Sequence, residues 1–381
     1  MNAPFSIVAT ETLGLNPVER DWVRAAAPRG WDALHAILAA SAYLDQAGEI
    51  RRAALLAAIE AGGYLSDRYR RKMMEPPLRP PVGGVLRPPP IQPGQVLNNF
   101  PPGWPAFDRP PALGAEERVD LIGPVLRDWT LRDQGADGTC VGFAAAAAAE
   151  RVLAPPGQRP PRLSAIFLYR RMRRLAERDP KPLFMPLGFD RGATKLGAAQ
   201  AVMQQEGVPP EADWPDESAP DADPPDEVLA RARKVAPVAY WDLGTARRPP
   251  NIARAVLDLL KEGRPVAVSL PVFLPPGSPP GSTDNWWLDS VVADGFVQDP
   301  PPDWPAAGAG HAVCILGFRP DPDRDLDGGW FVFRNSLGAR WATDAPDDSV
   351  RDPVVPGRGY GAISARYIER AVWEIMSPAL P

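Results

Sequence analysis

Apolar residues recur at three- and four-residue spacings across residues 17–74, and this periodicity predicts helices. Trp31, Leu34 and Leu38 follow the spacing, and the Ala, Leu and Arg that dominate the segment favour helix. Glycine and proline interrupt the pattern, so two or three helices are expected rather than one. We expect residues 1–75 to be a helical region that acts as a pro-region, an adaptor or a plain structural extension.

A second pattern begins near Glu116, where helical periodicity comes first and short strand-like runs follow. The predicted helices are 139–153, 164–178, 195–206 and 251–262, and the predicted strands are 266–273, 311–318, 330–334 and 360–364. The strand segments are apolar, β-branched or aromatic, and glycine or proline bounds them. Because a helix-rich half precedes a strand-rich half, we expect residues 115–381 to form one α+β domain of two packed lobes.

A proline-rich stretch separates these two regions. Residues 76–112 hold 13 of the 50 prolines of the chain, which excludes a continuous helix or a central strand there. We expect residues 76–114 to be a semi-extended connector. Its scattered apolar residues, among them Val85, Leu86 and Trp104, indicate that parts of it lie on the surface of the domain.

Composition narrows the class of protein. The chain has 381 residues, 45% of them hydrophobic and 23% charged, as in globular proteins. Its net charge of −5 disfavours a nucleic acid or an anionic membrane as a partner. No apolar run is long enough for a membrane span, and we expect no secretory signal. The two cysteines, Cys140 and Cys314, build no disulfide framework, so a cytoplasmic, reducing location is expected.

Cys140 has the setting of a reactive thiol. The sequence DQGADGTCVGF places it where a glycine-containing turn leads into a helix-forming run. At a helix N-terminus, backbone N–H groups and the helix dipole favour thiolate over thiol. The side chain of Gln134 and the backbone N–H of Cys140 could together donate hydrogen bonds to a developing oxyanion.

One of the two histidines is placed like a catalytic base. His311 begins a predicted strand in GAGHAVCILGF, whereas His35 lies in a predicted helix and is expected to be a packing or surface residue. Cys314, three residues beyond His311, faces the other side of the strand and is expected to be a buried core thiol. Asn335 follows the strand WFVFR. Its amide oxygen could orient the His311 ring, which leaves that ring free to pair with Cys140.

These ordered motifs resemble the papain-like cysteine peptidases. DQGADGTCVGF is similar to the segment that carries the family's nucleophile, GHAVCILGF to its histidine strand, and FRNSLGARW to its asparagine turn. The resemblance covers about residues 119–375. It implies a two-lobed fold, with a helical left lobe, a β-barrel-like right lobe and a cleft that binds an extended peptide.

The resemblance also implies a role for particular residues. Cys140 would be the nucleophile, His311 the general acid/base, Asn335 its orienter and Gln134 the oxyanion donor. Asp190, Gly192, Ala193 and Gly310 are expected to border the substrate. Trp341 matches a tryptophan that packs beneath the asparagine turn. Val141 and Leu337 stand where the family usually has tryptophan, which puts the strength of the ion pair in doubt.

The sequence therefore predicts a cysteine endopeptidase that acts on a peptide or protein through a Cys140 thioester. Two alternatives stay open: a catalytically weak scaffold that binds a peptide or protein partner, and a transpeptidase or maturation protease for a dedicated substrate. The 76–112 segment is a candidate to occupy the cleft. Two histidines and two cysteines leave no ligand set at zinc spacing, so no metal or other cofactor is expected.

Overall fold

The computed structural model describes the part of the chain that carries the predicted domain. The described residues are 85–86, 104–105, 112–116, 118–123, 129, 131–135, 138–154, 158–181, 184, 192–215, 224–243, 248–278, 287, 295–301, 303–321, 328–338, 341–342 and 359–379. The helices predicted for residues 1–75 lie outside these residues, as does Asp190.

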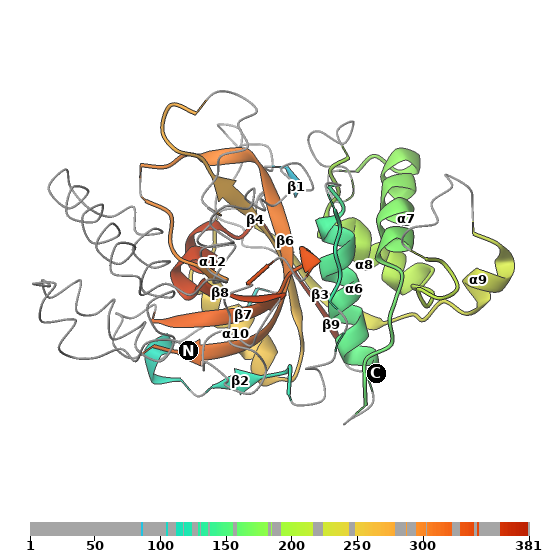
Figure 1. Cartoon of the computed structure of the whole chain (residues 1–381), viewed down its shortest axis with the longest axis horizontal. Coiled ribbons are helices and arrows are strands. Elements are labelled where there is room, and N and C mark those ends of the chain that lie inside the picture. Colours follow the sequence, from blue (N-terminus) through green and yellow to red (C-terminus); the bar gives the residue numbers. More distant parts are fainter. Residues whose placement is uncertain are drawn as a thin grey trace, which may run out of the picture.

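Helices and strands both contribute to the domain, in agreement with the predicted mixed fold (Figure 1). The helices are η1 (Leu113–Ala115), α6 (Cys140–Leu153), α7 (Ala165–Arg178), α8 (Leu196–Gln205), α9 (Asp226–Ala230), α10 (Ile252–Lys261) and α12 (Ala365–Ala371). The strands are β1 (Val85–Leu86), β2 (Val119–Asp120), β3 (Ala236–Asp242), β4 (Val266–Phe273), β5 (Phe296–Val297), β6 (Ala306–Pro320), β7 (Gly329–Arg334), β8 (Tyr360–Ser364) and β9 (Glu374–Ala379). All four predicted helices and all four predicted strands are confirmed. Among the described helices, none combines the length and the apolar character that crossing a bilayer requires.

The strands form a sheet that is open rather than closed. Within the described residues its order is β3-β9-β4-β6-β7-β8-β5, and β3 does not pair with β5 at the far end. The β-barrel-like form implied by the resemblance is therefore not what the described strands build, because a barrel needs its first and last strands to pair. A register shift between Ile315 and Gly317 on β6 marks a bulge, which bends the strand.

Strand β6 is the central strand of the sheet, because four other strands pair with it. Gly310 lies opposite Pro271 of β4 and also opposite Val85 of β1. These two neighbours must therefore occupy the two edges of β6. The backbone of the connector thus lies directly beside the residue that precedes His311.

Helix α6 packs on the sheet through β6, β4 and β9. In Figure 1, α6, α7 and α8 gather on one side of β6, and α10 and α12 lie on the other. Nearly every residue of α6 is buried. The alanine run makes this possible, because small side chains let the helix lie close to neighbours on several sides. A Cβ on Gly142 would come within 2.7 Å of the carbonyl oxygen of Ala165. Glycine at this position therefore lets α6 lie close to α7, and this contact fixes the start of α6.

Candidate active site

Cys140 is the first residue of α6, as the glycine turn predicted. Gly142 N–H and Phe143 N–H both donate to the carbonyl oxygen of Thr139, at 2.9 and 3.3 Å, and so form the first turn. Burial raises the pKa of the Cys140 thiol to about 12, while hydrogen bonds from the backbone N–H groups of Ala312, Val141 and Cys140 itself act to lower it. The contact with Ala312 places the sulfur against β6, one residue from His311.

His311 and Asn335 meet as the sequence predicted. The His311 Nε2 lies 2.8 Å from Asn335 Oδ1, and the same oxygen accepts the Ser336 backbone N–H at 2.9 Å. The amide is therefore held in one orientation, with its oxygen toward the imidazole. His311 Nδ1 has no hydrogen-bond partner among the described residues, so this nitrogen remains for a partner that approaches from Cys140 or from a substrate.

Trp287 packs against the histidine ring, a contact that the sequence analysis missed. Its ring stands edge-on to His311 at 5.2 Å between centroids, and it also contacts Trp341 at 5.3 Å. Trp287 is fully buried. The only sequence feature that could have pointed to Trp287 is the pair of adjacent tryptophans in NWWLD. This pair lies in an insertion without a strand or helix pattern. Trp287 therefore helps to keep water from the His311 ring, which is fully buried.

Burial keeps both Cys140 and His311 neutral. It lowers the pKa of His311 to about 4, against the opposing effect of the Asn335 hydrogen bond. Since the thiol pKa is about 12, neither group carries a charge near neutral pH in this conformation. The helix N-terminus does favour the thiolate, but desolvation outweighs it.

Gln134 lies against the turn that holds Asn335. Its backbone N–H donates to the Ser336 carbonyl at 2.8 Å, and the Ser336 hydroxyl donates to Gln134 Oε1 at 2.5 Å. A backbone hydrogen bond of 2.9 Å from Gly338 to Arg132 continues the pairing. The segment of Gln134 and the turn of Asn335 are therefore joined by hydrogen bonds of both backbone and side chains.

The expected substrate-binding residues occupy different settings. Gly192 has a positive φ of 89° and accepts the Tyr169 hydroxyl at 2.9 Å through its carbonyl. Ala193 is buried beside it. A Cβ on Gly310 would lie 2.1 Å from the Leu270 carbonyl oxygen, so only glycine fits there. Binding of substrate by these residues stays a prediction.

The supporting residues are all buried. Trp341 donates from Nε1 to the Tyr360 carbonyl at 3.1 Å, and its packing beneath the asparagine turn stays a prediction. Val141 lies within the first turn of α6. Leu337 forms an isolated β-bridge with Asp133, so it helps to join the turn to the segment before α6. Cys314 is buried near Arg334 and Glu150, with its pKa raised by burial to about 12, as a core thiol should be.

Comparisons with known proteins place the chain beside cysteine proteases. No family model and no curated protein matches the sequence. Among solved structures, xylellain, a cysteine protease from Xylella fastidiosa, is 19% identical with a TM-score of 0.48, over 81% of this chain and 99% of that one. Procathepsin B S9 from Trypanosoma congolense is 13% identical with a TM-score of 0.46, over 78% and 87%. Bromelain from Ananas comosus is 16% identical with a TM-score of 0.41, over 70% and 100%. The chain thus resembles papain-like cysteine proteases at low identity, and what its site can do is inferred from its own geometry.

The depressed pKa of His311 predicts a loss of stability in acid. Between the ordinary value of 6.5 and the folded value of about 4, the unfolded chain binds a proton on this ring that the folded chain does not. The free energy of unfolding should therefore fall as pH falls, by about 2 kcal/mol between pH 7 and 4.5. Urea unfolding at both pH values gives the change in the free energy of unfolding for the wild type and for His311→Gln, and the difference between these two changes is the contribution of His311. An equal change in the two proteins would contradict the burial of a neutral imidazole.

Proposed function

We propose that this chain is a cysteine endopeptidase in which Cys140 is the nucleophile and His311 the general acid/base. The observation that supports it most is the meeting of three segments distant in sequence. Cys140 begins a helix, and its sulfur accepts a hydrogen bond from the backbone N–H of Ala312 on β6, the residue that follows His311. Asn335 Oδ1 lies 2.8 Å from the His311 ring. Cysteine, histidine and an orienting amide are the parts of a nucleophilic acyl-transfer site.

The reaction proceeds through a thioester. Cys140 gives its proton to His311, and the sulfur attacks the carbonyl carbon of the scissile bond. The C–N bond breaks as His311 returns that proton to the leaving amine, which leaves the acyl group on sulfur. Water, deprotonated by His311, then attacks the thioester, and the peptide acid and the thiol are released. Gln134 donates to the oxyanion in both steps.

Exposure of the site is a required step of this proposal. With a thiol pKa of about 12 and an imidazole pKa of about 4, proton transfer from Cys140 to His311 is unfavourable while both groups are buried. Admission of water or of a polar substrate reduces the desolvation penalty and moves both pKa values toward each other. The resting chain is therefore expected to be less reactive than the open one.

Product analysis tests the proposal against its two alternatives. A library of quenched fluorescent peptides, analysed by mass with and without an added amine, should yield free carboxylic acids at internal bonds. Products joined to the amine would favour a transpeptidase. A scaffold would cleave none of the peptides yet would retain them in a binding assay. The absence of cleavage in both the full chain and a chain with an opened site would overturn the peptidase proposal.

The connector is proposed to occupy the cleft of the same molecule. Strand β1 pairs Val85 with Gly310, beside the catalytic histidine, and Trp104 packs edge-on to Trp241 of β3 at 5.0 Å between ring centroids. Farther along, Glu116 forms ion pairs with Arg254 and Lys261 of α10. Two described parts of the connector, β1 and Trp104, therefore contact the domain, and Glu116 lies just after the connector. A strand added at Gly310 takes backbone positions that an extended substrate would need.

Substitution of β1 by proline should expose the thiol. Proline donates no backbone hydrogen bond, so the double variant Val85→Pro, Leu86→Pro loses its pairing with β6. Because each such bond is worth about 1 kcal/mol, alkylation of Cys140 by iodoacetamide at pH 7 should accelerate about tenfold. Gln92→Pro, which adds a proline to the same connector outside β1, is the matched control. An unchanged rate in the double variant would show that β1 does not cover the site.

The organisation of the chain is part of the same proposal. Residues 115–381 would form the peptidase domain of two lobes, and residues 76–114 the connector that joins it to a helical region at 1–75. Cys140 and Cys314 are both free and buried, which suits the reducing cytoplasm proposed as its location.

A further inference from the structure

A buried carboxylate lies behind the candidate active site, and the sequence motifs do not involve it. Glu150, on α6 ten residues after Cys140, has no exposed surface. Its Oε1 accepts from Arg132 at 3.1 Å and from the backbone N–H of Leu163 at 2.9 Å. Its Oε2 accepts from Arg334 at 3.0 Å and from the indole of Trp129 at 3.0 Å. Each oxygen therefore serves two donors, and the carboxylate cannot turn without losing some of them.

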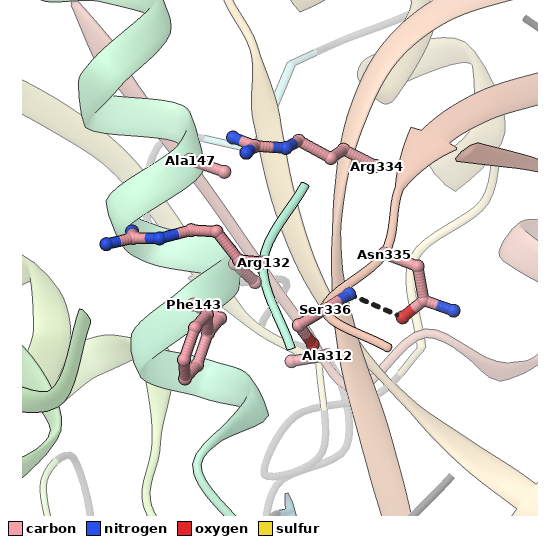
Figure 2. Close-up of a pocket in the computed structure, with 8 residues that line it drawn as sticks. Arg132, Phe143, Ala147, Ala312, Arg334, Asn335 and Ser336 are labelled. Atoms are coloured by element: carbon pink, nitrogen blue, oxygen red, sulfur yellow. Dashed lines mark hydrogen bonds between the residues drawn. The ribbon is translucent and has the colours of Figure 1, made fainter. Parts of the chain in front are cut away.

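The two arginines connect this carboxylate to the candidate catalytic residues. Arg132 is two residues before Gln134, and Arg334 immediately precedes Asn335. Figure 2 shows the guanidinium groups of Arg132 and Arg334 both reaching toward α6. One side chain on the helix of the nucleophile thus holds the segment of the oxyanion donor and the strand of the histidine orienter.

Aromatic rings fix the direction of both arginines. The Arg334 guanidinium lies 3.8 Å from the centre of the Trp129 ring, and that of Arg132 lies 5.4 Å from the Phe143 ring. Arg132 also reaches Glu211 at 3.2 Å. Planar guanidinium groups that are both stacked and hydrogen bonded have a defined orientation. Their positions are therefore set by geometry as well as by charge.

A small cavity borders both arginines and the turn that holds Asn335. It has a volume of about 10 Å³ and is lined by Arg132, Phe143, Ala144, Ala147, Ala312, Arg334, Asn335 and Ser336 (Figure 2). It lies between α6 and the strands, so packing does not fill the space beside Ala312, Asn335 and Ser336.

We propose that Glu150 is a positioning residue for catalysis, which through Arg132 and Arg334 holds Gln134 and Asn335 in register with Cys140. This inference rests on the proposed peptidase function. A buried ion pair adds little stability compared with well-packed apolar residues. A carboxylate that accepts donors on both oxygens does, however, fix the orientation of the side chains that donate to it. Misplacement of catalytic groups by about 1 Å is enough to reduce turnover about a hundredfold.

The isosteric variant Glu150→Gln tests the proposal. Glutamine keeps the size but has a single acceptor oxygen, so its NH₂ group must face donors on one side and release either Arg132 or Arg334. We expect kcat per titratable thiol to fall about 10- to 100-fold, with KM changed less than about threefold because the cleft walls are untouched. The matched control is Glu206→Gln, which makes the same change in an ion pair with Arg171 of α7 rather than with Arg132 or Arg334, and it should leave kcat within about twofold of the wild type.

Titration of the thiol with an epoxysuccinyl inhibitor counts folded sites, so a purely structural role would lower the titre and leave kcat per site unchanged. That result would overturn the proposal and leave the peptidase function intact. Failure of the wild type itself, with or without the β1 substitutions, to cleave peptides would instead reject the peptidase function.

If Glu150→Gln does not fold, the pair of variants Arg334→Lys and Arg334→Met provides a second test of the proposal. Lysine retains the charge that faces Glu150 and should recover part of the kcat that methionine loses. Equal kcat values for these two variants would also overturn the proposal.

Discussion

Replacement of Cys140 by alanine is expected to reduce kcat/KM by about 10⁴-fold or more, the largest effect of any single change. The other cysteine of the chain, Cys314, lies on β6 and not at the N-terminus of α6, and the thioester cannot form without the Cys140 sulfur. The measurement is cleavage of the best peptide from the library, under conditions in which the variant unfolds at the same urea concentration as the wild type.

Cys314→Ala is the matched control for that experiment. Both cysteines are fully buried, and burial raises the pKa of each to about 12. Only Cys140 lies at the start of a helix, with backbone N–H groups directed at the sulfur. Cys314→Ala should therefore keep activity within a few-fold of the wild type. If activity survives the loss of Cys140 but not the loss of Cys314, the nucleophile is Cys314 and the assignment of Cys140 is wrong.

Removal of the Gln134 side chain is expected to have the second largest effect. Gln134→Ala should lower kcat about 10²- to 10³-fold, as loss of one oxyanion donor does elsewhere, with a smaller change in KM. The donor stabilises charge that develops on the substrate oxygen only in the transition state. Steady-state kinetics at several peptide concentrations separates the two parameters.

Ser336→Ala separates the donor from its support. Its hydroxyl donates to Gln134 Oε1 at 2.5 Å, so this variant releases the amide but leaves the donor in the chain. We expect a loss well below that of Gln134→Ala. If Gln134→Ala retains wild-type kcat while Ser336→Ala is impaired, Gln134 supports the turn and takes no part in oxyanion binding.

The local features of the site were predictable because they depend on neighbouring residues. A glycine turn followed by helix-forming residues places Cys140 at the start of α6, and the apolar run before Asn335 is a strand with a turn at its end. The hydrogen bond between His311 and Asn335 followed from the order of the motifs. The placements of Cys140 and of the strand before Asn335 rest on short-range propensity, which a single sequence carries, whereas the contact between His311 and Asn335 rests on the order of the motifs.

The long-range features were not predictable in the same way. Strand β9 is short and follows directly on α12, so its pairing with β3 and β4 leaves no periodic signal of its own. Trp287 comes from an insertion without pattern. Glu150 reads as a polar end to an alanine run, and its burial depends on donors that are 18 and 184 residues away.

The protonation state of Cys140 and His311 could not be predicted from the sequence either. A helix N-terminus predicts a low thiol pKa, and the backbone N–H groups around Cys140 do act in that direction. Desolvation depends on what covers the site, and it reverses the result. In the proposed mechanism the reactivity of Cys140 would therefore depend on whether the site is covered, and the position of β1 would control it.

Location of a covalent adduct tests the central claim most directly. The full chain and the Val85→Pro, Leu86→Pro variant are treated with an epoxysuccinyl peptide inhibitor at pH 7, and the modified residue is identified by peptide mass mapping. We predict one adduct per chain, on Cys140, formed faster in the variant and absent from His311→Ala, which lacks the base. An adduct on Cys314, or equal labelling of Cys140 with and without His311, would contradict a thiol activated by this histidine.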